Sequence, residues 1–431
     1  MASGLSKSLG VFRGAALLLN IVIGAGLLTL PGLAIKQLGN QAFSSWIVCA
    51  LSALPLLAVF IVLGRRYPEA GGVTAYALRA FGEYGRNATT ALFLGAVVLG
   101  LPAISLAGGH YIASSVGGNP HVYGFGLILL AAGLHFLPGE GAAKAMTLIA
   151  SGIISAVIVF LIIGAIGLIG GPPLQPIEPP SLSQTMTRGG SFMMLFFAFT
   201  GWEVGAGIAE EFKEPKFQYP AAMLLSFALA TALYLSSAFI AQNVDLGGNY
   251  EAPFVAMTRP IMGRWGASAV AIVAGTIILA NLASAIWGVS RLIFSLARDK
   301  ILPSILTTLS RGKPIAAVVA ISTVLILVLG LDGGGLLGLE KMIAIAGQNF
   351  LLIYGVAAGA LIVLSRTFLE RFLGIGVLLL VILLMVQHGE ATLYPMALLG
   401  LSAAFTYTRR WVASTGTRLT NRFRGKVAGG E

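Results

Sequence analysis

The chain has 431 residues, of which 57% are hydrophobic and only 10% are charged, with a mean hydropathy of +0.90. Average proteins carry about 25% charged residues, so this composition excludes an ordinary soluble domain and predicts an all-α polytopic membrane protein. The formal net charge of +11 would suggest nucleic acid as the partner of a soluble protein. In a membrane protein it reflects Lys and Arg in cytoplasmic loops, so the expected surroundings are a lipid bilayer and no nucleic acid.

The first apolar stretch, residues 17–38, is long enough to span a bilayer, which takes roughly 20 residues. Gly24-Ala25-Gly26 lies in its middle and Pro31-Gly32 follows. Glycine costs about 1 kcal/mol relative to alanine in a helix interior, and proline about 3. Irregular backbone at membrane depth is tolerated where it is buried in protein or lines a cavity, so the interruption predicts a binding site. The alternative is that these small residues only let a neighbouring helix approach closely.

A second interrupted stretch, residues 191–212, favours the binding site over close packing. It repeats the tripeptide as Gly205-Ala206-Gly207 and adds Thr200-Gly201 and the carboxylate of Glu203. Two interrupted spans at corresponding places in two halves of a chain are the best indication in a sequence of a transporter site.

The apolar runs predict about twelve transmembrane helices, so both termini lie on one side. The predicted spans are 11–38, 42–64, 87–116, 122–138, 144–170, 190–212, 219–243, 266–296, 315–331, 342–364, 372–388 and 392–408. When alternate loops are sorted, 22 of the 27 Lys and Arg residues fall on the side of the termini, which puts both termini in the cytoplasm.

Five predicted spans precede the second interrupted one and five begin with it, which fits a 5 + 5 repeat of inverted topology with discontinuous helices 1 and 6. The predicted divisions are 1–170 for the first repeat, 188–364 for the second, 372–408 for two additional helices and 409–431 for a basic cytoplasmic tail. Segments 64–86 and 249–263 are predicted as interfacial helices. The alternatives are a gate under the substrate cavity for the first and an outer lid for the second.

Glu203 is the only acidic residue that we place deep inside a span, and an ionisable group at that depth is a functional candidate by default. It is predicted to exchange the coupling proton; the alternative is a structural carboxylic acid bonded to backbone freed at the break. Other side chains near the breaks either contact a substrate or pack against neighbouring helices. These candidates are Phe197, Phe199, Trp202, Asn281 and Ser284.

The sequence shows no pattern of enzymatic or ATP-driven chemistry. It has no HExxH motif, and the single cysteine, Cys49, excludes an internal disulfide and a paired-cysteine metal site. The glycine-rich run 333–341 lacks the Gly-Lys-Ser/Thr order of a P-loop. We therefore expect no enzyme activity, no metal and no cofactor.

Two motifs carry a resemblance to a known family: Ile23-Gly24-Ala25-Gly26, and the run FAFTGWEVGAGIAEEFKEP at 197–215. Over essentially the whole chain they resemble the amino acid–polyamine–organocation superfamily of transporters. Within it, the runs GRRYPEAGGV, GLPAISLAGG and EFKEPKFQYPAAM are most similar to the bacterial exporters of methionine and branched-chain amino acids.

The resemblance implies the fold of the leucine transporter, in which spans 1, 2, 6 and 7 move against spans 3, 4, 8 and 9. It implies that the α-carboxylate of the substrate meets backbone N–H groups around Gly24, Ala25 and Gly26. The α-amine would meet carbonyls around Phe199, Thr200, Gly201 and Trp202. In relatives, the aromatic residue matching Phe197 caps the substrate and the glutamate matching Glu203 is implicated in proton coupling. The last two spans are candidates for a homodimer surface by analogy alone.

One departure from relatives leaves the coupling ion open. Some proton-coupled relatives place a lysine in the middle of span 5, but here that region, 149–160, has only Ser151 and Ser155 as polar groups. Lys144 lies too near the cytoplasmic end to replace that lysine.

These observations predict a secondary transporter for neutral apolar L-amino acids (methionine, leucine, isoleucine and valine) in a bacterial inner membrane, working as a proton-coupled exporter by antiport. One alternative is a proton-coupled importer. Another is an exchanger of cationic amino acids or amines, which becomes plausible if Glu203 faces the substrate. A third is a non-transporting amino-acid sensor that signals through the basic tail.

Overall fold

The computed structural model describes the backbone of residues 7, 9–69, 71–136, 140–179, 191–310, 312–386 and 392–427. Over these residues the secondary structure is helical, with two isolated bridges, Leu9–Phe212 and Ser310–Lys313, in place of a sheet. Eight helical segments in the described part are long and apolar enough to cross a membrane, and three shorter apolar helices accompany them. The prediction of an all-α polytopic membrane protein is confirmed, whereas the number of twelve spans stays a prediction.

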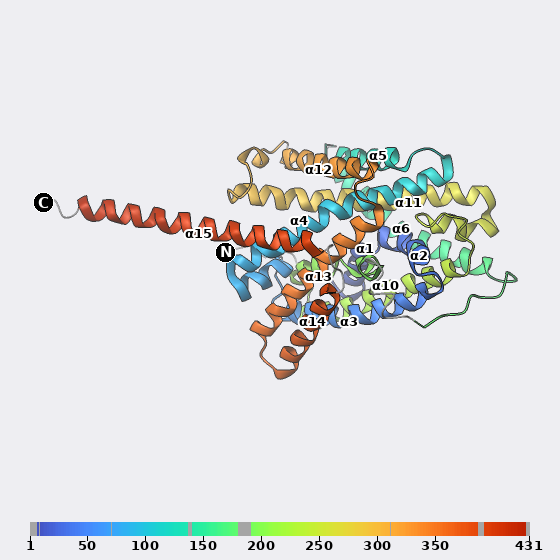
Figure 1. Ribbon diagram of the computed structural model, residues 1–431, viewed down its shortest axis with the longest axis horizontal. Helices are drawn as coiled ribbons and strands as arrows, with labels where there is room; N and C mark the ends of the chain where they lie inside the picture. Colours follow the sequence, from blue (N-terminus) through green and yellow to red (C-terminus); the bar gives the residue numbers. More distant parts are fainter. Residues whose placement is uncertain are drawn as a thin grey trace.

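The helices, in chain order, overlap every predicted span. They are α1 (Val11–Val22), α2 (Ala25–Leu38), α3 (Ala42–Arg66), α4 (Gly72–Val116), α5 (Pro120–Gly133), α6 (Glu140–Gly167), α8 (Ser191–Phe196), α9 (Trp202–Gly205), α10 (Gln218–Gln242), α11 (Pro253–Arg298), α12 (Ile315–Gly333), α13 (Leu339–Leu364), α14 (Phe368–Val386) and α15 (Leu393–Val427). Short 3-10 turns are η1 (Gly39–Gln41), η2 (Leu134–Phe136), η3 (Phe197–Phe199), η4 (Ala206–Glu211) and η5 (Ser304–Thr307). In Figure 1 the long helices α4, α11 and α12 run along the long axis of the molecule and pack together.

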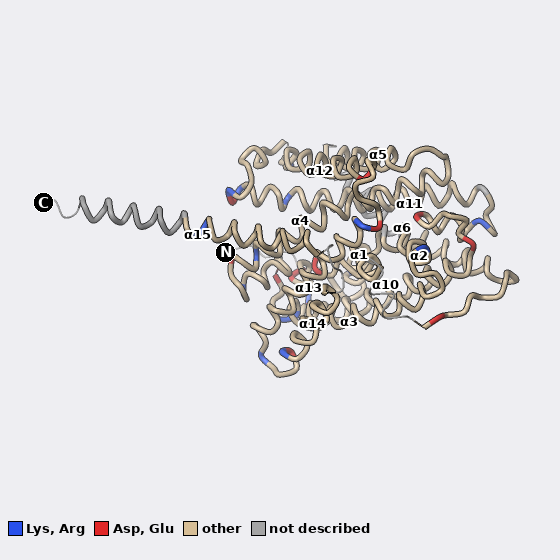
Figure 2. The backbone as a smooth tube through the Cα atoms, in the orientation of Figure 1, with Lys and Arg blue, Asp and Glu red and all other residues tan. Residues whose placement is uncertain are grey.

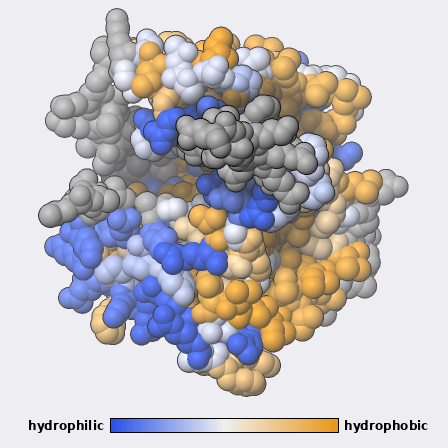
Figure 3. All heavy atoms as spheres, turned by 90° about the vertical axis from the view of Figure 1, so that its left-hand side faces the viewer, coloured by the Kyte–Doolittle hydropathy of each residue, from blue (hydrophilic) through white to orange (hydrophobic). Residues whose placement is uncertain are grey.

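Charged residues lie mostly near helix ends and in connections, and the middle parts of the long helices are nearly free of them (Figure 2). Viewed from the left-hand side of Figure 1, hydrophilic side chains gather over one part of that end, beside hydrophobic ones (Figure 3). Among the described residues, only Glu203 and Asp332 are charged and buried. Asp332 lies at the end of α12 and contacts His121 at 2.8 Å, whereas Glu203 lies in the first turn of the short helix α9, beside the second break.

The two longest helices, α4 and α11, each bend at a glycine near their beginning. Gly82 has φ 65° and ψ −151°, and Gly263 has φ 54° and ψ −141°, a region that favours glycine. The arm before Gly82 buries Val73 and Tyr76, and the arm before Gly263 buries Phe254. Both amphipathic segments predicted from the sequence are therefore helical, with their apolar sides packed on the rest of the protein.

Two features of the sequence meet other outcomes. Pro31 does not interrupt the chain a second time but lies inside α2. The basic tail does not begin as a separate segment, because α15 continues as one helix to Val427. Between α6 and α8, residues 171–179 are irregular, and residues 180–190 lie outside the described residues.

Candidate functional site

The first break lies where the sequence predicts it. Helix α1 ends at Val22, Ile23 is extended with φ −76° and ψ 111°, Gly24 has φ −149° and ψ −140°, and Ala25 begins α2. The N–H of Ile23 still donates to the carbonyl of Leu19 at 2.8 Å, which completes α1. The first N–H groups of a helix have no intrahelical acceptor, so the start of α2 offers backbone donors and the positive end of its dipole.

The second break lies four residues before the repeated tripeptide. Helix α8 ends in the turn η3, Thr200 is extended with φ −97° and ψ 167°, and Gly201 is left-handed with φ 111° before α9 begins. Gly205-Ala206-Gly207 instead lies where α9 passes into η4. The tripeptide therefore marks irregular backbone in the first stretch and only a tightening of the helix in the second.

The two breaks contact each other. A Cβ on Gly26 would lie 3.2 Å from Cα of Ala198, and a Cβ on Gly201 would lie 3.2 Å from a methyl of Val22. The hydroxyl of Tyr234, on α10, lies 3.1 Å from the carbonyl oxygen of Val22 and 2.8 Å from that of Ala198. Tyr234 thus links the last carbonyl of α1 to a carbonyl of η3, just before the second break.

Glu203 belongs to the second break. Its side chain is only 4% exposed. Its Oε2 accepts hydrogen bonds from the N–H of Gly201 at 2.9 Å and from the hydroxyl of Tyr354, on α13, at 2.8 Å. The bond from Gly201 matches the structural role considered for this carboxylate, and its exchange of a proton stays a prediction.

Tyr234 and Tyr354 were not among the residues selected from the sequence. Both are buried tyrosines on apolar helices. A buried phenol needs a hydrogen-bond partner, so each one indicates a polar group nearby. That signal was available in the sequence, but it does not say which of many backbone carbonyls the phenol meets.

The two candidate residues on α11, Asn281 and Ser284, differ in their surroundings. A Cβ on Gly24 would lie 2.9 Å from Nδ2 of Asn281, so the Asn281 amide contacts the first break. Ser284, one turn further along the same helix, is exposed. Asn281 therefore lies at the first break in this structure, and the contact of Ser284 with a substrate stays a prediction.

The three aromatic candidates, Phe197, Phe199 and Trp202, also differ in their surroundings. Phe199 packs at 5.3 Å from the ring of Tyr234 and at 6.0 Å from Phe227, and Trp202 packs at 5.8 Å from Phe227. Both side chains are buried in this aromatic cluster. Phe197 is half-buried and reaches a cavity instead.

The cavity lies beside the first break and is small, with a volume of about 10 Å³. A space of about 10–15 Å³ holds roughly one water molecule, so the cavity must widen before it can take an amino-acid side chain. It is lined by Gly26, Thr29, Leu30, Ala103, Ile104, Ala107, Phe197 and Ile343. Apart from the threonine, the side chains around it are apolar, and none is charged.

The comparisons with known proteins agree with one another. A family model described as amino acid permease matches residues 9–412. The chain is 28% identical over 408 residues to the uncharacterized amino acid permease YecA of Bacillus subtilis (strain 168), covering 92% of this chain and 95% of that protein. It is 29% identical over 415 residues to the L-methionine/branched-chain amino acid exporter YjeH of Escherichia coli (strain K12), with the same shares covered. It is 24% identical over 292 residues to the cadaverine/lysine antiporter of Escherichia coli (strain K12), covering 65% of this chain and 64% of that protein.

Proposed function

The chain belongs to the amino acid permease family, and on that premise we propose that it is a secondary transporter of neutral apolar L-amino acids. The proposed substrates are methionine, leucine, isoleucine and valine, moved by alternating access. We further propose that it works as a proton-coupled exporter in a bacterial inner membrane, with both termini in the cytoplasm. Like its relatives, the protein is a transporter and not an enzyme.

The observation that carries the substrate class is the apolar cavity at the first break. Its lining supplies carbon surface and no charged side chain. A charged substrate side chain buried there would lose its hydration without a partner, which is strongly unfavourable. An aliphatic or thioether side chain has no charge to desolvate, and burial of its apolar surface is favourable.

The polar part of an amino acid fits the two breaks. The start of α2, at Ala25 and Gly26, offers N–H donors to a carboxylate, and the carbonyls that end the half-helix before Gly201 offer acceptors to an ammonium. Opening of the bond between Tyr234 and Ala198 would free one such carbonyl for the substrate amine. Phe197, at the cavity, would cover the bound side chain.

Corresponding bends after the two breaks support the inverted 5 + 5 repeat. The bend at Gly82 follows the break at Gly24 by 58 positions, and the bend at Gly263 follows the break at Gly201 by 62 positions. In this arrangement α1, α2, α3, α8, α9 and α10 form the moving bundle, and α4, α5, α11 and α12 form the scaffold. The site then lies between the two groups, because the cavity is lined by both α2 and α4.

Counterflow in liposomes tests the proposal. Purified protein is reconstituted with unlabelled methionine inside, and labelled methionine is added outside at two pH values. We expect transient accumulation of label that leucine competes and that arginine and glutamate do not. Protein-free liposomes give the background. Absence of accumulation with every one of the twenty amino acids would refute the substrate class, and competition by arginine or lysine would favour a cationic exchanger.

A further inference from the structure

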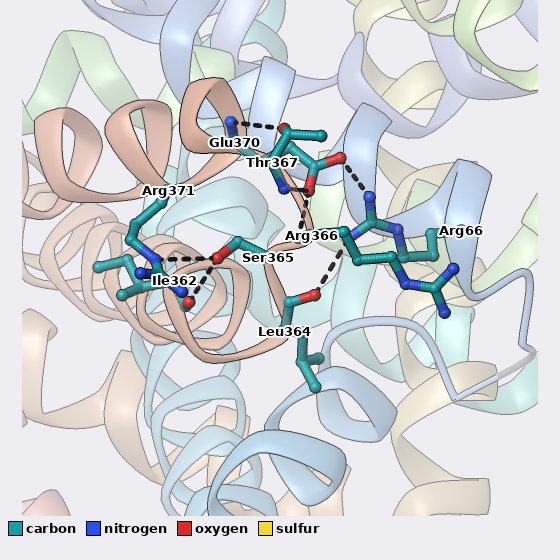
Figure 4. Close-up of polar contacts among 8 residues, drawn as sticks. All are labelled: Arg66, Ile362, Leu364, Ser365, Arg366, Thr367, Glu370 and Arg371. Carbon is teal, nitrogen blue, oxygen red and sulfur yellow. Dashed lines mark hydrogen bonds and ion pairs between the residues drawn. The ribbon is translucent and has the colours of Figure 1, made fainter.

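The end of α3 and the connection between α13 and α14 meet in one polar junction (Figure 4). Arg66, the last residue of α3, forms an ion pair with Glu370, and its guanidinium donates to the carbonyl oxygen of Leu364 at 3.1 Å. Leu364 ends α13, where the last carbonyl groups of a helix lack intrahelical donors. The side chains of Arg66 and Glu370 are both only 17% exposed, so this ion pair is largely enclosed.

Glu370 also completes the start of α14, and both of its carboxylate oxygens are occupied. Thr367 precedes the helix, and its hydroxyl accepts from the N–H of Glu370 at 3.3 Å. Oε2 of Glu370 accepts from the N–H of Arg366 at 2.8 Å and from that of Thr367 at 3.4 Å, the reciprocal pattern of a capping box. Oε1 pairs with Arg66. The charge of Glu370 is therefore committed to Arg66 and to backbone groups.

Two arginines beside this junction have no carboxylate partner among the residues that the structure describes. Arg65 lies in the last turn of α3 and Arg366 in the connection before α14, and both are exposed. In Figure 4 the guanidinium of Arg366 carries no dashed contact. Glu69, which follows α3, pairs with Arg79 instead of Arg65. The junction therefore presents uncompensated positive charge at the surface.

Large apolar side chains are exposed immediately beside these arginines. Phe368, Leu369 and Phe372, at the start of α14, are 85%, 74% and 64% exposed. The rings of Phe368 and Phe372 stack with their centroids 6.3 Å apart. Helix α14 is long and apolar enough to cross a membrane, so its first turns lie where acyl chains meet the lipid headgroups. Apolar side chains next to basic ones at this level are typical of surfaces that bind anionic lipid.

We propose that the junction between α3 and α14 binds the headgroup of an anionic phospholipid such as phosphatidylglycerol. Arg65 and Arg366 bind the phosphate, and Phe368 and Phe372 pack against the acyl chains. A guanidinium suits this role because it presents two parallel N–H donors to a phosphate and stays charged at physiological pH. The bound lipid joins α3 to the α13–α14 connection in addition to the enclosed ion pair. The site lies apart from the two breaks and does not depend on which substrate the protein carries.

Binding of radiolabelled phosphatidylglycerol to the purified whole chain in a neutral detergent tests the site without measuring transport. The competitors are unlabelled phosphatidylglycerol, phosphatidylcholine with the same acyl chains, and sodium phosphate. We expect phosphatidylglycerol to compete about tenfold or more better than phosphatidylcholine, because basic residues favour the anionic headgroup. Millimolar sodium phosphate should leave the label bound. Equal competition by the two lipids would overturn recognition of the charge, and displacement by phosphate would overturn a lipid as the occupant.

The variant Arg65→Gln/Arg366→Gln removes both unpaired guanidiniums and leaves the ion pair of Arg66 and Glu370 in place. Its affinity for phosphatidylglycerol should fall by roughly thirtyfold, because each basic residue near an anionic lipid contributes about 1 kcal/mol, a factor of about five. Arg65→Lys/Arg366→Lys keeps both charges and should bind more tightly than the glutamine variant. Equal affinities of these two variants would overturn the role of the charges.

Arg259→Gln/Arg298→Gln is the matched control. It also removes two exposed arginines that form no ion pair within the described part of the chain, but at other places on α11. It should keep the parent affinity for phosphatidylglycerol. Equal losses in the control and in the junction variant would mean that the net charge of the protein attracts the lipid, and would overturn the site. Failure of counterflow with every amino acid would instead refute the substrate proposal and leave the lipid-binding result standing.

Discussion

The two helix breaks have related sequences, but different side chains contact them. At the first break, Ile23 and Gly24 interrupt the helix, and the side chain that contacts them is the amide of Asn281. At the second break, Gly201 takes a left-handed conformation and its N–H is held by Glu203, which Tyr354 holds in turn. The first break offers backbone N–H donors at the start of α2, whereas at the second break the N–H of Gly201 is already bonded to Glu203. The difference assigns ligand binding to the first and proton exchange to the second as the hypothesis to test.

The largest effect is expected from Gly201→Ala. Its φ of 111° and the 3.2 Å approach to Val22 leave no relaxed place for a Cβ. Left-handed backbone costs a non-glycine residue roughly 1–2 kcal/mol, so both thermal stability and counterflow should fall steeply. Gly126→Ala is the control, because Gly126 lies inside α5 without a positive φ and a Cβ there would meet no atom within 4 Å. An equal loss for Gly126→Ala would show that the effect is not specific to the second break.

Glu203→Gln should separate coupling from binding. The amide keeps the shape of the carboxylate but exchanges no proton, so stimulation of transport by a pH gradient should disappear while counterflow without a gradient continues. Glu210→Gln, in the turn η4 at the end of the same span, is the control and should keep its response to the gradient. A pH-gradient response in Glu203→Gln equal to that of the parent would remove Glu203 from the coupling role.

Tyr234→Phe tests the link between the breaks. It removes a hydroxyl shared by the carbonyls of Val22 and Ala198, at a cost of about 1 kcal/mol of unfolding free energy for one hydrogen bond. We expect counterflow to fall by roughly five- to tenfold, in line with that energy. Tyr394→Phe loses a comparable bond, 3.2 Å to the carbonyl of Gly95, away from both breaks and should transport normally. Equal losses in both variants would mean that only stability is affected.

The smallest effect on transport is expected from substitutions on α11. Asn281→Ala removes the amide at the first break and should raise the KM for methionine by about three- to tenfold, the effect of one hydrogen bond. Ser284→Ala should leave the KM unchanged, because Ser284 is exposed in this structure. A change at Ser284 with none at Asn281 would show that the substrate contacts α11 one turn beyond Asn281.

The sequence alone was sufficient for properties that depend on composition and local backbone preference. Apolar runs with few charges require a bilayer, so the membrane class and the helical spans followed from hydropathy. Gly24 and Thr200-Gly201 indicated where the first and sixth predicted spans are interrupted, because glycine weakens a helix wherever it stands. Glu203 was conspicuous because a carboxylate in an apolar span has few possible roles.

Only the tertiary structure decided which groups meet. Gly205-Ala206-Gly207 repeats the first tripeptide but stays helical, since the backbone strain is taken up earlier at Gly201. Tyr234 and Tyr354 lie more than 30 residues along the chain from either break and yet contact the breaks. Asn281 contacts the first break from α11, whereas Ser284, one turn further along, is exposed. Such outcomes depend on the rotation of each helix against its neighbours. In a chain that is apolar on nearly every face, hydrophobic periodicity carries little information about that rotation.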